Sequence, residues 1–264
     1  GIVAGQRVSI ANALTLGALE LQSAAVKGGP RLDGLVYTIF EDDPDVPQGR
    51  REVARSAAAA PRFNLPAGTY YVVARRGPTE ARDRVSVRTG EVERHTMVLE
   101  SGRIDIAVRL PAGAQIENEG PITHRLERID VQPPELLTAS GISASLEAAS
   151  GHYRLRSRIG IGNVEAEREL QVKPGEVQRI IIEHTAAGVR FRMFERTGSQ
   201  PLPDVSFEVR DARGRSVWAG LGVDPRVLLV AGRYTVRAEA GSLALERTFD
   251  LPPGNDKVID LAPR

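Results

Sequence analysis

The chain contains no cysteine and only one tryptophan, and aromatic residues make up 5% of its 264 positions. The lack of cysteine excludes disulfides, thiolate zinc sites and cysteine nucleophiles. The net charge is also close to zero, with 35 basic against 34 acidic residues, and the basic residues do not cluster. Because proteins that bind nucleic acid usually carry a basic patch, we expect no nucleic-acid partner.

Two further absences bear on location. No apolar run approaches the roughly 18 residues that a membrane-spanning helix needs, so we expect no membrane insertion. The first residues, Gly1 to Gly5, lack the charged and apolar regions of a signal peptide. Either the protein is cytoplasmic or an export signal has been removed.

What the chain does contain is a pattern that returns three times. A cassette of a glycine, a variable residue and a tyrosine occurs at Gly68–Tyr70, Gly151–Tyr153 and Gly232–Tyr234. A second glycine follows each tyrosine after 20, 22 and 20 positions, at Gly90, Gly175 and Gly254. A third glycine opens an alternating run at Gly17, Gly102 and Gly188. Landmarks that keep their spacing through three copies indicate tandem repeats with a period of 85 to 86 residues.

Between the landmarks, apolar and polar residues alternate over short stretches bounded by Gly, Pro and Asp, which is typical of strands in sandwiches. The sequence therefore predicts an all-β fold of three tandem antiparallel Ig-like or prealbumin-like β-sandwich repeats, at 17–101, 102–187 and 188–264, joined without flexible linkers. One stretch conflicts with this register: 51–60 includes four consecutive alanines and favours helix by propensity. We expect a strand or sheet edge there, with a one-turn helix as the alternative.

Residues 1–16 match the end of a repeat. Gly5 precedes Gly17 by 12 positions, as Gly90 precedes Gly102. We interpret this segment as the last strand of a preceding repeat, which would make the chain a fragment or mature form of a longer protein. The alternative is an N-terminal strand that pairs onto the first repeat.

The cassette has a physical interpretation. We expect its glycine to take a positive φ at a turn, a conformation that costs other residues energy. The tyrosine then begins a strand and points into the core, with its hydroxyl bonded to the backbone, as in the tyrosine corner of immunoglobulin-like sandwiches. Alternation places Tyr70, Val72 and Ala74 inward.

The same alternation turns Tyr71 and Val73 outward. The other two cassettes place polar residues on that side, Arg154, Arg156, Arg233 and Thr235. Tyr71 and Val73 are therefore covered by an adjoining repeat or form an interaction surface for a partner. We favour the first interpretation because repeats without linkers must touch, and we keep the second.

A search for chemistry gives little. The four histidines, His95, His124, His152 and His184, lie about 30 residues apart, without the close spacing of a local metal site. His152 fills the variable cassette position and is expected on the surface. The acidic turn Asp42, Asp43 and Asp45 could suit calcium, but it lacks EF-hand spacing and its prolines favour a rigid solvated turn.

No nucleophile elbow, phosphate-binding loop or dinucleotide-binding glycine pattern occurs. We therefore predict no catalytic residue, no cofactor and no enzyme activity in this chain. A Ser–His–Asp arrangement assembled across the fold cannot be read from sequence.

Three stretches carry a resemblance: Gly102–Ile106, Gly151–Tyr153 and Leu229–Ala238. They are similar to the C-terminal repeat region of uncharacterised alphaproteobacterial envelope proteins, some with von Willebrand A domains. Single units also resemble prealbumin-like and carboxypeptidase-regulatory-like sandwiches. The resemblance covers glycines and core positions, and it implies a structural spacer or protein-interaction role in the periplasm or outside the cell.

Two alternatives to a spacer remain. One is a ligand-binding module that uses the loops of one repeat for a carbohydrate or a peptide. The other is an accessory region of an enzyme whose site lies upstream. The scarcity of aromatic residues leaves few stacking platforms for carbohydrate, which favours the spacer and a protein partner.

Overall fold

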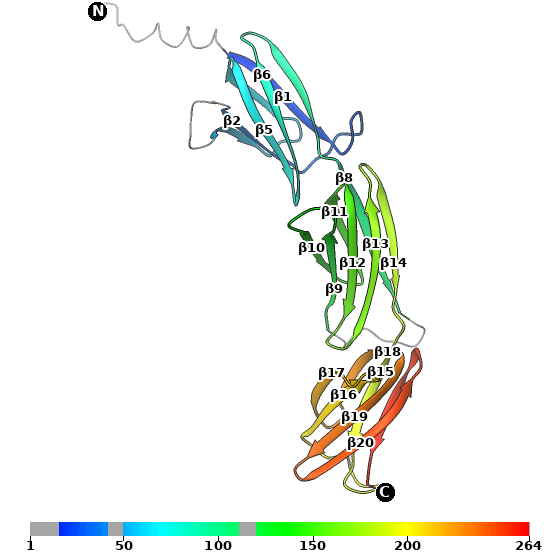
Figure 1. The fold of residues 1–264 in the computed structure, drawn as a ribbon. Coiled ribbons are helices and arrows are strands. Elements are labelled where there is room, and N and C mark those ends of the chain that lie inside the picture. Colours follow the sequence, from blue (N-terminus) through cyan, green and yellow to red (C-terminus); the bar gives the residue numbers. More distant parts are fainter. Residues whose placement is uncertain (1–15, 42–49, 111–119, 264) are drawn as a thin grey trace, which may run out of the picture. The chain divides into compact units, whose positions relative to one another are not determined.

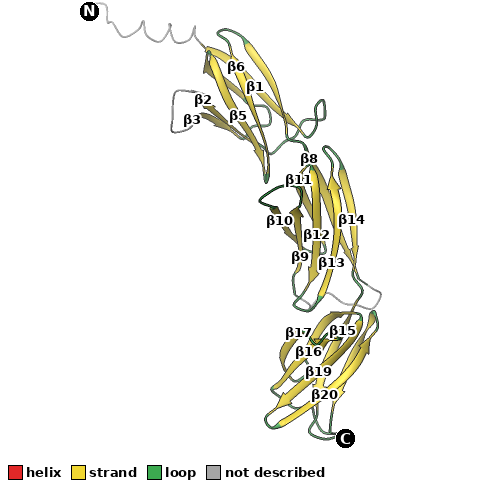
Figure 2. Cartoon of the chain, in the orientation of Figure 1, coloured by secondary structure: helices red, strands yellow, loops and turns green. Residues whose placement is uncertain are grey.

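The computed structural model describes residues 16–41, 50–110 and 120–263. Within these ranges all regular elements are β-strands, and they form three three-stranded and three four-stranded sheets. The sheets pair into three sandwiches, each with one sheet of either size (Figure 1). The predicted all-β fold of tandem sandwich repeats is therefore confirmed, and Figure 2 shows it as strands and loops alone.

The first sandwich contains seven strands in two sheets, ordered β4-β1-β7 and β3-β2-β5-β6. Their bounds are β1 Leu16–Ala24, β2 Val36–Glu41, β3 Arg51–Ser56, β4 Arg62–Pro66, β5 Gly68–Arg76, β6 Thr79–Val87 and β7 Val92–Val98.

The second and third sandwiches repeat this order strand for strand, as β11-β8-β14 with β10-β9-β12-β13 and as β18-β15-β21 with β17-β16-β19-β20. In the second, the strands are β8 Ser101–Arg109, β9 Ile122–Arg128, β10 Glu135–Ser140, β11 Ser143–Ala149, β12 Gly151–Ile159, β13 Val164–Val172 and β14 Val177–Glu183. In the third, they are β15 Ala186–Met193, β16 Val205–Asp211, β17 Ser216–Gly222, β18 Arg226–Val230, β19 Gly232–Ala240, β20 Leu243–Leu251 and β21 Gly254–Leu261.

One term of the prediction needs correction, because the sheets are not purely antiparallel. In the first sandwich β1 pairs with β7 in parallel, and in the third β15 pairs with β21 in parallel. A chain that alternates direction through seven strands brings the first and the seventh to the same direction. When these two strands become neighbours in one sheet, they must pair in parallel.

The predicted alternation decides which residues form the core. In β5, Tyr70, Val72 and Ala74 are buried, and their counterparts in the other sandwiches, Tyr153 and Tyr234 among them, are also buried. The cores consist mainly of aliphatic and aromatic side chains that strands of both sheets point inward. Burial of such side chains is the main favourable term for each sandwich.

The alanine-rich stretch 51–60 follows the repeat register rather than helix propensity. Residues Arg51–Ser56 form β3, which pairs with β2, and 57–60 continue as an irregular segment with bends. Pairing with β2 satisfies the backbone polar groups on one side of β3. The four consecutive alanines lie beyond the end of this strand, at 57–60.

The glycine landmarks of one repeat meet in space. The amide of Gly90 donates a hydrogen bond of 3.0 Å to the carbonyl of Leu16, just before Gly17. Gly90 has a left-handed backbone with φ 74°. Gly17 is needed for a different reason, because a Cβ there would collide with the carbonyl of Arg88. The second repeat shows the same bond, from Gly175 to the carbonyl of Ser101. These glycines therefore allow a left-handed turn and a close backbone approach.

The chain divides into two compact units. The first comprises residues up to 104 with 146–151 and 171–178, and the second comprises 105–145, 152–170 and 179–264. The boundary thus runs through the second sandwich, and the repeat limits from the sequence stay a prediction. The described part of the chain contains no helix that is long and apolar enough to span a membrane.

The predicted strand at 1–16 and the acidic turn at Asp42, Asp43 and Asp45 fall outside the described residues, except for Leu16 in β1.

Candidate functional site

The cassette tyrosines link the two sheets of a sandwich. Tyr70 donates a hydrogen bond of 2.8 Å to the carbonyl of Pro66, and Tyr234 donates one of 2.7 Å to the carbonyl of Val230. Each acceptor ends the strand before the cassette, which belongs to the opposite sheet. The predicted corner geometry is confirmed for these two. Burial raises the pKa of all three cassette tyrosines, that of Tyr153 to about 12, so their buried hydroxyls stay neutral.

The expected positive φ at the cassette glycines is wrong. Gly68 and Gly232 have negative φ, and Gly151, with φ 158°, is close to fully extended. Each glycine is the first residue of a strand, and the ring of the tyrosine two positions later lies over Gly68 and Gly232. A Cβ there would be in ordinary contact with the ring, since the nearest ring atoms lie 3.6 to 3.8 Å away. The left-handed turn occurs instead at the downstream glycines.

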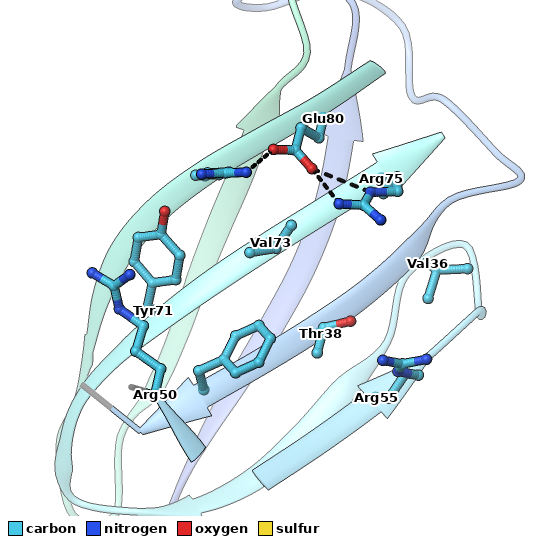
Figure 3. A pocket seen from close by; sticks show the side chains of 10 residues that line it. Val36, Thr38, Arg50, Arg55, Tyr71, Val73, Arg75 and Glu80 are labelled. Carbon is cyan, nitrogen blue, oxygen red and sulfur yellow. Dashed lines mark hydrogen bonds and ion pairs between the residues drawn. The ribbon is translucent and has the colours of Figure 1, made fainter. Parts of the chain in front are cut away.

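Tyr71 and Val73 lie on the outer face of the sheet β3-β2-β5-β6, as predicted from the alternation, where they line a groove of about 550 Å³ (Figure 3). Phe40 stands directly opposite Tyr71 across the β2–β5 pair, and Thr38 stands opposite Val73. Val36 extends this floor and is 40% exposed. Two strands therefore supply a floor that is mainly apolar, with Thr38 as its polar member, on the outer side of the sheet.

Arginines surround this floor. The guanidinium of Arg50 lies 3.6 Å from the centre of the Tyr71 ring, a cation–π contact. Arg55 comes from β3, Arg75 from the end of β5 and Arg82 from β6, all lining the same space. We name this feature the arginine-rimmed groove: floor Val36, Thr38, Phe40, Tyr71 and Val73, with rim Arg50, Arg55, Arg75, Arg82 and Glu80.

Among the described residues that line the groove, Glu80 is the one carboxylate, and two arginines share it. Arg75 donates to it at 2.6 Å, and Arg82 forms a second ion pair with it. The hydrogen bond from Arg75, followed by the interactions with Arg82, lowers the pKa of Glu80. Glu80 is thus ionised when it pairs with the two arginines.

The same face in the other repeats has a different composition. Counting from the cassette tyrosine, Tyr71 corresponds to Arg154 and Thr235, and Val73 corresponds to Arg156 and Arg237. In the second repeat these arginines bind acidic residues of β13, Glu167 and Glu169. In the third, the outward charges also pair, for example Arg233 with Asp250. Such exposed pairs cover a sheet face without forming an apolar floor.

Within the second compact unit, strands of the second and third repeats share an apolar core. Four of its members come from β8, β9, β12 and β13 of the second sandwich and two from β15 and β18 of the third: Val108, Ile122, Ile159, Val164, Ala186 and Leu228. Asn163 lies beside this core. Its Nδ2 donates to the hydroxyl of Tyr234 at 2.9 Å, and its Oδ1 accepts from the amide of Val230 at 3.0 Å. One asparagine therefore joins a turn of one repeat to the tyrosine corner of the next.

Within the first compact unit, a polar contact joins the first and second repeats. Arg76, the last residue of β5, forms an ion pair of 3.0 Å with Glu147 of β11. The hydroxyl of Ser101 donates to the same carboxylate at 3.0 Å. Arg76 and Glu147 are partly buried, which makes this pair stronger than one in open solvent.

The histidines divide into two classes. His152 is exposed, as predicted, and His95 of β7 lies 3.0 Å from the carboxylate of Asp83. His124 and His184 are 0% and 4% exposed and belong to a buried cluster with Ser157, whose hydroxyl lies 3.3 Å from Nε2 of His184. Burial and then His124 lower the pKa of His184.

Sequence reasoning missed this cluster, because each histidine was interpreted separately. A signal was present, since His124 and Ser157 occupy inward positions of their alternating strands. The cluster is closed to solvent on all three side chains, so it offers no access to a substrate. Among the residues that the structure describes, no group of three or more His, Cys, Asp or Glu could hold a metal ion.

Trp218 is not a surface platform. It is 7% exposed and stacks on Phe191 inside the third sandwich, with ring centres 5.7 Å apart. The aromatic residues available for stacking on a ligand in the groove are therefore Tyr71 and Phe40.

Comparison with known proteins gives one match to a protein family and several to solved structures. Residues 188–263 match the model of a Rhizobiales growth-associated tandem repeat domain. This supports the repeat region in the predicted resemblance, while its von Willebrand A and prealbumin details stay predictions. No curated protein matches the sequence.

The similar solved structures include surface proteins. A streptococcal ancillary pilin is 13% identical, covers 94% of this chain and 99% of its own, and has a TM-score of 0.33. A putative adhesin from Bacteroides ovatus is 11% identical over 69% of this chain and 98% of its own, with a TM-score of 0.34. The Bacillus anthracis TIE protein is 15% identical with a TM-score of 0.29; it covers 95% of this chain, which spans about half, 51%, of that protein. At these TM-scores the likenesses carry no inference about function.

Proposed function

We propose that the chain is a non-enzymatic module of tandem β-sandwich repeats, a structural spacer that also presents a protein-binding surface, in the bacterial cell envelope or outside the cell. The repeats at 17–101, 102–187 and 188–264 are its units. The envelope location rests on the sequence resemblance and on the bacterial family that residues 188–263 match.

The observation that carries the spacer role is the core that the second and third repeats share. Four side chains from strands of the second sandwich and two from strands of the third are buried together, and Asn163 bonds to two groups of the third sandwich. A flexible tether would leave these apolar surfaces exposed to water. A spacer needs a fixed connection between its units, because it holds another domain at a set distance only when each unit is fixed to the next.

The protein-binding surface is the arginine-rimmed groove of the first repeat. Its floor is mainly apolar, whereas the other two repeats carry ion pairs on the same face of the sheet. Exposed aromatic and arginine side chains are the residue types enriched where proteins bind each other.

Ligand binding by one repeat is the second candidate, and the volume of the groove favours it. Of the two ligands considered, peptide fits better than carbohydrate, because Trp218 lies in the core and the floor mixes aliphatic with aromatic side chains.

The spacer role can be tested with spin labels, for which a chain without cysteine is well suited. Labels at Arg125→Cys and Ser206→Cys, two exposed positions in the second and third repeats, should give one narrow distance distribution by pulsed electron resonance. Insertion of about ten Gly and Ser residues after His184 should broaden it, because such linkers behave as flexible coils. A broad distribution in the parent chain would contradict the spacer.

A further inference from the structure

The two junctions between repeats use equivalent positions of each repeat. At both, the end of the cassette strand of one repeat lies against the strand that precedes the cassette of the next. The last residue of the cassette strand stands six positions after the cassette tyrosine, at Arg76 and Ile159, and we name it the tip position. Its counterpart in the next repeat stands six positions before the tyrosine, at Glu147 and Leu228, and we name it the receiving position.

At the first junction both positions are charged. Arg76 forms its ion pair of 3.0 Å with Glu147, and the two side chains are 35% and 22% exposed. Ser101, the first residue of β8, donates a hydrogen bond of 3.0 Å to the same carboxylate. Two charges that are partly removed from water depend on each other, because removal of either leaves the other without its partner.

At the second junction the same positions are apolar. Ile159 and Leu228 belong to one buried cluster and are 0% and 1% exposed. Ala186, the first residue of β15 and thus the counterpart of Ser101, belongs to the cluster as well. The turn after Ile159 approaches closely, since a Cβ at Gly162 would collide with the carbonyl of Leu228. This junction therefore suits an apolar residue at the tip position.

A mismatch at either junction has a cost. An isoleucine at the tip position against Glu147 would leave a partly buried carboxylate without its cation. An arginine at the tip position against Leu228 would bring a guanidinium into an apolar cluster that is closed to water. Both changes cost free energy, because a charge loses water and gains no partner. Unpaired groups of this kind are a common source of specificity between protein surfaces.

From these two matched pairs we infer that the tip and receiving positions determine which repeat docks on which. The surface around Glu147 accepts a repeat with a cation at its tip position, and the surface around Leu228 accepts a repeat with an apolar residue there. The inference rests on the proposed spacer role and names the residues that give its repeats a fixed order. The equivalent positions that take part in neither junction hold uncharged residues, Asn64 and Ala240.

The test uses the full chain with spin labels at Ser86→Cys and Gln171→Cys, exposed positions of the first and second repeats. Pulsed electron resonance should give one narrow distance distribution. Arg76→Glu and Glu147→Arg each place like charges together, so each should shift the ratio of docked to free repeats roughly tenfold toward the free form. This shift appears as a broad component. Spectra at several urea concentrations below the unfolding transition make the shift visible even when docking is tight.

Matched variants separate pairing from a requirement for one particular residue. Arg76→Glu combined with Glu147→Arg reverses the ion pair and should restore the narrow distribution. Arg76→Ile combined with Glu147→Leu and Ser101→Ala introduces the residue types of the second junction and should restore it as well. Ala240→Glu and Asn64→Arg are the controls, since they place the same charges at equivalent positions outside both junctions. Neither control should change the distribution, and circular dichroism checks that every variant is folded.

The outcomes distinguish the inference from the proposed function. Narrow distributions in both single variants would overturn the inference, as would matched variants that stay as broad as the single ones. In these cases the spacer role stands, because the parent chain is still narrow. A broad distribution in the parent chain would contradict the spacer role and the inference with it.

Discussion

Asn163 of the second repeat donates a hydrogen bond of 2.9 Å to the hydroxyl of Tyr234 in the third. The same hydroxyl donates to the carbonyl of Val230, four residues before it, and the amide of Val230 in turn donates to Asn163. The three groups form a closed set of hydrogen bonds around one tyrosine corner. A structural feature of a single repeat has thus become a connection between two.

The tyrosine corners give a prediction about stability. Tyr70→Phe removes one hydrogen bond, to the carbonyl of Pro66, and should lower the free energy of unfolding by about 1 kcal/mol. Tyr234→Phe also leaves Nδ2 of Asn163 without its acceptor, so it should cost about 1 to 2 kcal/mol more than Tyr70→Phe. Urea unfolding followed by circular dichroism compares the two variants. Equal costs would show that Asn163 contributes nothing at this corner.

Two glycines of the first repeat should differ in how much stability the protein loses when each is replaced by alanine. Gly90 has φ 74° and open space around it, so Gly90→Ala should cost about 1 kcal/mol, the strain of a left-handed alanine. At Gly17 a Cβ would meet the carbonyl of Arg88, and backbone cannot move aside as a flexible side chain can. Gly17→Ala should therefore cost more than Gly90→Ala, by about 1 to 3 kcal/mol. The reverse order in thermal unfolding would contradict the close approach.

The buried His184 predicts a dependence on pH. Burial and His124 hold its pKa below the ordinary value of 6.5. The unfolded chain therefore binds a proton that the folded chain does not, and stability falls as the pH drops below about 6.5 toward the lower pKa of the folded state. Above this range both states are neutral at His184, so the full stability is present.

Hydrogen exchange of β12, measured at pH values of about 7.5 and 5.5, tests this. Exchange corrected for its intrinsic pH dependence should show weaker protection at the lower pH. His184→Gln should reduce the pH effect, and the exposed His152→Gln is the control that should retain it. An unchanged effect in His184→Gln would assign the dependence to another group.

The sequence predicts features that depend on residues close together along a strand, such as which side chains point into the core. Alternation alone placed Tyr70, Val72 and Ala74 in the core and Tyr71 and Val73 outside, because side chains of a strand alternate between its two faces. Repeat register correctly predicted a strand within 51–60, at Arg51–Ser56, whereas the alanine run at 57–60 is irregular. The positive φ was assigned to the wrong glycine, because spacing shows that a glycine recurs but does not show the conformation in which it is held.

Relationships between distant strands could not be predicted in this way. Asn163 and Tyr234 are 71 residues apart, and His124 and His184 are 60 apart. The arginine rim illustrates the limit, since Arg55 and Arg82 flank Tyr71 only because β3 and β6 are the edges of a sheet whose centre is β2 and β5. Alternation gives the direction of a side chain, and sheet order is needed to give its neighbours.

The central claim, that the second and third repeats are held to one another and do not unfold independently, can be tested through the single tryptophan. Trp218 is buried in the third sandwich, so its fluorescence reports the unfolding of that repeat. Asn163→Ala, a change in the second repeat, should lower the stability reported by Trp218 by about 1 to 2 kcal/mol in urea, because the amide of Val230 loses its acceptor. Asn64→Ala, at an exposed position of the first repeat, should leave it unchanged. A Trp218 transition in Asn163→Ala that coincides with that of the parent chain would contradict the claim.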